Sequence, residues 1–113
     1  MDTWLLDEAI VKRRERLELQ RRQLLKEVED ALDKLKIDFD EAYIFGSLAR
    51  PYQFLPHSDI DICFVGLDKR DFFKVWAELT RRLSYDNIQI LRMEEIDFKE
   101  KILKEGILWK RKV

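Results

Sequence analysis

Two short apolar runs, each joined to residues that favour turns or carry charge, constrain the fold of this chain most strongly. Residues 42–45 (Ala-Tyr-Ile-Phe) are followed by Gly46-Ser47, and Ser58-Asp59 precedes residues 60–65 (Ile-Asp-Ile-Cys-Phe-Val). Runs of β-branched and aromatic residues bounded by Gly, Ser or Asp are typical of buried strands. The sequence therefore predicts strands at residues 41–45 and 59–65, joined by a loop over residues 46–58.

The second predicted strand begins with two alternating carboxylates. Successive side chains of a strand point to opposite faces, so Asp59 and Asp61 share one face, about 7 Å apart at their Cα atoms. Ile60, Ile62 and Phe64 then face the core. Two carboxylates on one face repel each other unless a cation lies between them. Oxygen ligands of this kind suit Mg²⁺ or Mn²⁺.

The first predicted strand ends in a turn suited to an anion. Gly46 permits a tight turn, and Ser47 is a good N-cap for a short helical piece. The N–H groups there can hold a phosphate, and Arg50 adds a fixed positive charge. Each motif alone is common in ordinary turns and solvated sheet edges. Both at this spacing favour a site for a metal-bound nucleoside triphosphate.

These residues carry a resemblance to a known family. The segments Gly46-Ser47-Leu48-Ala49-Arg50 and Ser58-Asp59-Ile60-Asp61 resemble the motif of the polymerase-β-like nucleotidyltransferases. The chain is most similar to the minimal nucleotidyltransferase group, whose members often pair with helical HEPN-domain proteins. The resemblance covers about residues 20–110, nearly the whole chain.

The resemblance implies roles for individual residues. Asp59 and Asp61 would be catalytic and would bind Mg²⁺ or Mn²⁺. The substrate would be a nucleoside triphosphate, expected to be ATP, and the residues that contact it would be Gly46, Ser47, Arg50 and Ser58.

The sequence departs from the family pattern at one site that bears on catalysis. The family usually has a third carboxylate on a later strand, and the matching position here is Gln89. An amide oxygen can bind Mg²⁺, but it is neutral and is not a base. Asp86, Glu94 and Glu95 are the nearby substitutes. Either the reaction runs slowly on two carboxylates, or one of these residues compensates, or the domain only binds nucleotide.

Residues 4–36 form the longest predicted element, because apolar residues recur there at helical spacing without Gly or Pro. A helix of this length is about 45 Å long, more than a small domain can cover. We expect residues 17–36 to pack on the sheet and residues 1–16 to project or bend back, with Trp4 in contact with another chain. The basic residues Arg13, Arg14, Arg16, Arg21 and Arg22 are expected on a solvated face with ion pairs, rather than on RNA.

The remaining pattern predicts a helix over residues 69–83, a strand over 87–92, a helix over 98–105 and an extended end. The helix over 69–83 is expected to bury Phe72, Val75, Trp76, Leu79 and Leu83. The order predicts an α/β fold, a small mixed sheet with helices packed on one side and a long N-terminal helix. We expect one domain over residues 1–113, with residues 110–113 as a flexible tail.

Composition narrows the function further. The 22 basic and 23 acidic residues nearly balance, so nucleic acid is not an expected partner. The single cysteine excludes an internal disulfide and a cysteine-based zinc site. No apolar run approaches the ~18 residues that span a membrane. With no leader pattern at the N-terminus, we expect a cytoplasmic protein.

The sequence thus favours a Mg²⁺-dependent nucleotidyltransferase that moves a nucleoside monophosphate to a hydroxyl acceptor. By resemblance, the acceptor is on a HEPN-type partner protein, and the chain is the antitoxin half of a pair. The alternative is a binding module with weakened chemistry that neutralises or scaffolds a partner. Self-association through the N-terminal helix is a further possibility under either function.

Overall fold

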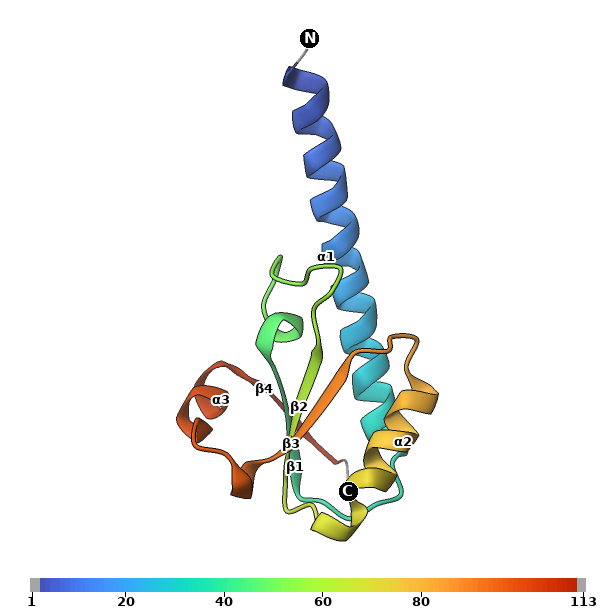
Figure 1. The fold of residues 1–113 in the computed structure, drawn as a ribbon, viewed down its shortest axis with the longest axis vertical. Coiled ribbons are helices and arrows are strands. Elements are labelled where there is room, and N and C mark those ends of the chain that lie inside the picture. Colours follow the sequence, from blue (N-terminus) through green and yellow to red (C-terminus); the bar gives the residue numbers. More distant parts are fainter. Residues whose placement is uncertain (1–2, 112–113) are drawn as a thin grey trace.

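The computed structural model describes residues 3–111 and contains three α-helices and a four-stranded sheet within them (Figure 1). The elements in chain order are α1 (Thr3–Lys34), β1 (Glu41–Phe45), β2 (Ile60–Val65), α2 (Phe72–Arg82), β3 (Ile88–Arg92), α3 (Lys99–Glu105) and β4 (Ile107–Lys110). Short 3-10 turns occupy Gly46–Ala49 (η1), Lys69–Asp71 (η2) and Met93–Glu95 (η3). The expected α/β fold with a long N-terminal helix is confirmed.

The sheet is mixed, with the strand order β3-β2-β1-β4. β1 pairs antiparallel with β2 on one side and with β4 on the other. β2 pairs in parallel with β3, and the crossover between them contains α2. The chain segment after α3, expected only to be extended, is therefore a full edge strand.

One face of the sheet carries the main core. α1 and α2 lie on this face, to the right of the sheet in Figure 1. Their buried side chains meet residues from all four strands, and the cluster includes Leu24, Val28, Leu32, Ala42, Ile44, Ile62, Phe64, Val75, Leu79, Ile90 and Trp109. The apolar positions of α1 and α2 at helical spacing thus face the inward positions of the strands.

The opposite face is covered only in part, by α3 and η3 (Figure 1). Tyr43, Cys63, Met93 and Ile102 form a second, smaller buried cluster there. The two longer helices therefore pack on one side as expected, whereas the short α3 lies on the other. The reason is that strand alternation leaves apolar side chains on this face too, and Ile102 covers them.

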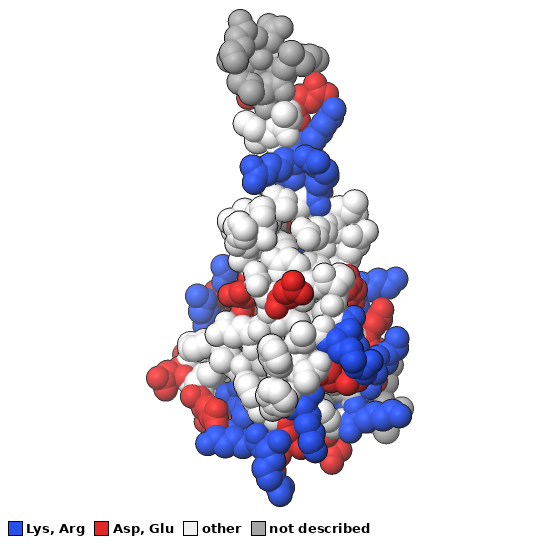
Figure 2. Space-filling view, turned by 45° about the vertical axis from the view of Figure 1, so that its right-hand side comes forward, with Lys and Arg blue, Asp and Glu red and all other residues white. Residues whose placement is uncertain are grey.

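The N-terminal half of α1 extends beyond the sheet (Figure 1). Every described side chain of residues 7–16 is exposed, and burial begins at Leu17 and Glu18. The molecule measures 58 × 29 × 24 Å along its principal axes. Figure 2 shows basic side chains gathered on this projecting part, above a wide uncharged area. The side chain of Trp4 lies outside the described part of the structure.

The positions of Trp76 and Arg111 differ from the sequence-based expectations. Trp76 is exposed and lies against the ring of Phe73, because the buried stripe of α2 runs through Val75 and Leu79 instead. Arg111 donates hydrogen bonds to the carbonyls of Leu35 and Ile37, where we expected the flexible tail to have begun. Residues 112–113 lie outside the described chain. None of the described helices is long and apolar enough to cross a membrane.

Candidate functional site

The turn after β1 lies directly against Asp61, the carboxylate of β2. Phe45, the last residue of β1, is paired in register with Asp61. Gly46 follows with a φ of +70°, in the left-handed region that favours glycine. A Cβ atom at this position would overlap Asp61 Oδ2. Glycine is therefore required twice here, by the backbone conformation and by the close approach of the carboxylate.

Asp61 is half-buried and incompletely satisfied. Its Oδ1 atom is buried and has no hydrogen-bond partner among the described residues. Burial, and secondly the negative charge of Asp59, raise the pKa of Asp61 to about 6. A buried carboxylate oxygen without a donor is a position where a cation can bind. The two carboxylates, Asp59 and Asp61, therefore fit a hard divalent cation held by oxygen ligands.

The third strand places an amide beside this pair. Gln89 on β3 is paired in register with Asp61 on the adjacent, parallel β2. Neighbours in register point to the same face of a sheet, so Gln89 occupies the position next to Asp61. Its side chain is exposed and neutral. Within the described residues, no group of three acidic, histidine or cysteine side chains could hold a metal ion.

Two of the carboxylates named from the sequence as substitutes, Glu94 and Glu95, do not replace Gln89. Glu94 accepts a hydrogen bond from the backbone N–H of Gly66, beyond the far end of β2. Gly66 is five residues after Asp61, roughly 16 Å away at the usual rise of a strand. Glu95 pairs with Arg92 and Lys69 at the same far end. Their positions follow from β3 running parallel to β2.

The cationic residue of the turn already has a partner. Arg50 Nη2 donates to Glu105 Oε2 at 2.6 Å, and both side chains are partly exposed. This ion pair ties the end of η1 to the end of α3. A phosphate bound at the turn would compete with Glu105 for the guanidinium.

The loop before β2 is held by its own hydrogen bonds. Ser58 Oγ accepts from the N–H of Leu55 at 2.8 Å, and the Ser58 carbonyl accepts from the Tyr85 hydroxyl at 2.6 Å. Phe54 is buried against the Tyr85 ring. His57, the only histidine, is exposed. These hydrogen bonds of Ser58 fix the start of the segment that carries Asp59 and Asp61.

A buried ion pair on α1 anchors the turn that follows β1. Glu18 and Arg21 are 2% and 6% exposed and form two hydrogen bonds of 2.7 and 2.9 Å. Arg21 Nη1 also donates to the Leu48 carbonyl in η1 at 2.8 Å. Glu18 Oε1 accepts from the Tyr52 N–H at 2.7 Å. Arg21 thus holds the start of the segment from Leu48 to Tyr52, and Glu18 holds its end.

Sequence reasoning missed this pair, since Arg21 was expected on a solvated face. The hydrogen bond from Arg21 lowers the pKa of Glu18 to about 2, against the opposing effect of burial. Tyr52, whose N–H the pair binds, has a φ of +63°, a conformation that is unfavourable for a bulky residue. The Glu18–Arg21 pair therefore supports a strained point of the loop.

Comparison with known proteins agrees with this arrangement. A family model described as "Polymerase beta, Nucleotidyltransferase" matches residues 26–112. No curated protein matches the chain in sequence. Among solved structures, a protein from Sulfolobus solfataricus provisionally called a nucleotidyltransferase is 29% identical. Its TM-score is 0.50, and the match covers 80% of this chain and 84% of that one.

Two further structures share the fold. They are mutant forms of the toxin–antitoxin MntA-HpeT, with TM-scores of 0.51 and identities of 18% and 20%. These matches cover 81% and 80% of this chain, and 74% and 72% of those chains. The family match spans most of the chain and includes both strands that carry the carboxylates and the turn. The chain therefore belongs to the polymerase-β nucleotidyltransferase family.

Proposed function

We propose that this chain binds a nucleoside triphosphate with Mg²⁺ or Mn²⁺ and transfers the nucleoside monophosphate to a hydroxyl group of a partner protein. The observation that carries the proposal is the buried Oδ1 of Asp61, which has no partner within residues 3–111, beside the left-handed turn at Gly46. A metal-bound triphosphate needs a cation site and a phosphate site side by side. Asp61 offers the cation site, and the turn at Gly46 next to it offers the phosphate site. Family membership supports the same activity.

In this proposal Asp59 and Asp61 hold the metal, which supplies positive charge against the triphosphate. The N–H groups of Gly46 and Ser47 bind phosphate oxygens at the start of η1. Arg50 contributes once a phosphate displaces Glu105. The acceptor oxygen forms a bond to the α-phosphorus, and the bond to pyrophosphate breaks. The hydroxyl proton leaves to water or to a group of the partner, because the Gln89 amide is not a base.

Gln89 also supports a second candidate function. A site with two carboxylates and an amide holds less negative charge for a metal than a site with three. In the alternative, the domain retains nucleotide binding or only the fold, and it neutralises or scaffolds a partner. The two functions differ in whether the effect on the partner requires Asp61.

The acceptor is proposed to come from a separate helical protein of the HEPN type, with ATP as the donor. Support comes from the shared fold of MntA-HpeT, which is described as a toxin–antitoxin. Ile10 and Val11 on the projecting part of α1 are 65% and 57% exposed, which suits a contact with a protein. This surface is the proposed contact for the partner or for a second copy of the chain.

Calorimetry with the four nucleoside triphosphates tests the site directly. We expect binding that requires Mg²⁺ and disappears in Asp61→Asn. Asp38→Asn is the matched control, because Asp38 is an exposed aspartate before β1, at the opposite end of the sheet from Gly46. Equal binding by wild type and Asp61→Asn would contradict the assignment of the metal site.

Transfer is tested with ATP labelled at the α-phosphate. We expect label to appear on a co-purified partner protein with the wild type and not with Asp61→Asn. Neutralisation of the partner by both proteins, without label, would favour the binding module over the enzyme.

A further inference from the structure

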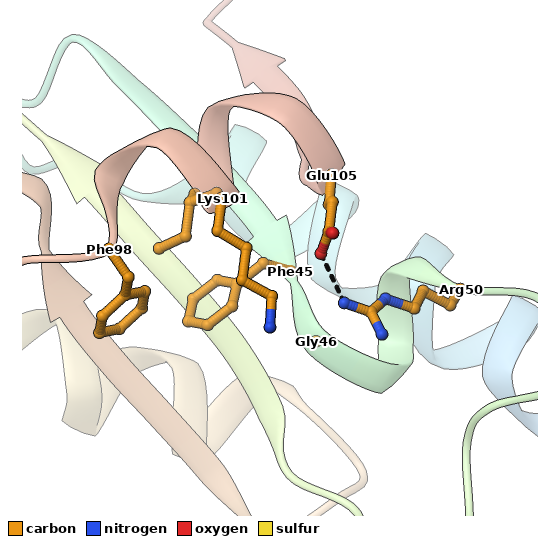
Figure 3. A pocket seen from close by; sticks show the side chains of 7 residues that line it. Phe45, Gly46, Arg50, Phe98, Lys101 and Glu105 are labelled. Atoms are coloured by element: carbon orange, nitrogen blue, oxygen red, sulfur yellow. Dashed lines mark hydrogen bonds and ion pairs between the residues drawn. The ribbon is translucent and has the colours of Figure 1, made fainter.

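A cavity of about 180 Å³ opens beside the turn that carries Gly46, on the face of the sheet that α3 covers (Figure 3). Its apolar wall is made by Phe45 at the end of β1, and by Phe98 and Ile102 from the α3 region. The two phenylalanine rings lie 6.4 Å apart at an angle of 56°. Phe98 is 46% exposed, a large open surface for an aromatic ring.

The cavity is continuous with the proposed phosphate site. Gly46 and Arg50 line it, and both belong to the turn described above. Phe45 is also the register partner of Asp61, so the apolar wall and the carboxylate lie on neighbouring strands about 5 Å apart. A molecule with phosphates on the turn therefore reaches this cavity without crossing another element.

The size and chemistry of the cavity restrict its ligand. Ligand pockets for whole small molecules usually measure at least about 300 Å³, so this one holds a single ring system and leaves charged groups outside. Aromatic walls favour a flat ring. The rim has Lys101 and Glu105, a donor and an acceptor at the edge of such a ring (Figure 3). These features together describe the base of a nucleotide.

We propose that the cavity between Phe45, Phe98 and Ile102 binds the nucleobase of the nucleoside triphosphate whose phosphates lie on the Gly46 turn. This inference rests on the proposed function and extends it to the position of the base. The base stacks on the exposed ring of Phe98, and the ribose passes between this cavity and Asp61. Arg50 and Glu105 line the rim that faces the phosphates, so Glu105 stays beside the base when a phosphate displaces it from Arg50.

The test separates the base from the phosphates by measuring two ligands. The binding of Mg²⁺-ATP and of Mg²⁺-tripolyphosphate, which has no base, is measured by calorimetry for each variant. Phe98→Ala is expected to weaken ATP about tenfold or more, the usual effect of removing a stacked ring, and to leave tripolyphosphate unchanged. Phe73→Ala is the matched control, since Phe73 is an exposed ring on α2, on the opposite face.

Each result has a distinct meaning. If tripolyphosphate binds and Phe98→Ala retains the ATP affinity of the wild type, the base site is wrong and the proposed function stands. If the wild type binds neither ligand, both proposals fail. If Phe98→Ala weakens both ligands equally, the ring supports the turn and not a base. Should Phe98→Ala unfold, Phe98→Leu keeps an apolar contact with Phe45 and is expected to lose ATP affinity alone.

Discussion

The Glu18–Arg21 pair offers the sharpest prediction about the site. In Glu18→Gln, the amide keeps the shape of the side chain and can still accept from the Tyr52 N–H. Arg21 loses its carboxylate, yet it stays 6% exposed and bound to the Leu48 carbonyl. A buried guanidinium without a counter-charge is strongly unfavourable. We therefore expect a large loss of stability from a substitution that replaces only one heavy atom, an oxygen by a nitrogen.

The magnitude follows from the titration of the glutamate. The fold lowers the pKa of Glu18 from 4.5 to about 2. At 1.36 kcal/mol per pKa unit, the folded state favours the charged form by about 3 kcal/mol. This value agrees with the 3–5 kcal/mol usually lost on breaking a buried pair. For a domain of this size, the melting temperature should fall by roughly 10–15 °C.

Urea unfolding near pH 7, followed by circular dichroism, measures this loss. Glu15→Gln is the matched control, because Glu15 lies one turn away on α1 and makes only exposed contacts of 3.3 Å to the Tyr52 hydroxyl. Its expected effect is below about 0.5 kcal/mol. The double variant Glu18→Gln with Arg21→Met should recover part of the stability, since both charges are removed while the Tyr52 N–H keeps an acceptor. A loss below about 1 kcal/mol in Glu18→Gln would refute the reasoning.

The same pair predicts how stability depends on pH. Because the folded-state pKa of Glu18 is below its unfolded value, its contribution is present above about pH 4.5 and is lost as the pH falls towards 2. The stability of the wild type should therefore drop more steeply than that of Glu18→Gln between pH 5 and 2.5. Parallel curves for the two proteins would show that the ion pair does not stabilise the fold.

Three further predictions concern the site and the projecting helix. Asp61→Asn should make the metal-free protein about 1–2 kcal/mol more stable at pH 8, because the fold raises the pKa of this carboxyl and ionisation there opposes folding; an unchanged denaturation midpoint would contradict this. Gln89→Asp should lower the melting temperature without metal and enlarge the upward shift caused by Mg²⁺, since a third carboxylate joins the pair; equal shifts in a thermal scan would refute it. Ile10→Asp with Val11→Asp should abolish binding of the partner protein, or of a second copy of the chain, in sedimentation. The melting temperature should stay within about 2 °C, because both side chains are exposed; unchanged binding would exclude this surface as the contact.

The first three strands could be predicted from the sequence to within one residue at each end. The runs at residues 42–45 and 60–65 are apolar, short and bounded by Gly46 or Asp59, so local chemistry defines their ends. The family pattern assigned Gln89 to the position of the third carboxylate, and the structure pairs Gln89 with Asp61 on the adjacent strand. β4 was harder, because its four residues become a strand only through pairing with β1, far away in sequence.

The Glu18–Arg21 pair could not be predicted from charge spacing alone. Charges three residues apart on a helix usually form a solvated ion pair. One signal was present: Arg21 lies four residues after Leu17, three before Leu24 and seven before Val28, so it interrupts an apolar stripe. The pair anchors the loop through Tyr52, and only the folded chain brings that loop across the stripe.

The projecting end of α1 has a consequence for how the protein behaves in solution. A compact chain of 113 residues has an expected radius of gyration of about 13 Å, whereas this one has 16.2 Å. An elongated particle diffuses more slowly than a sphere of equal mass, so a monomer should elute from a sizing column ahead of globular standards. A monomer with the projecting helix can therefore elute at the volume of a globular dimer. Light scattering, which measures mass directly, distinguishes the two.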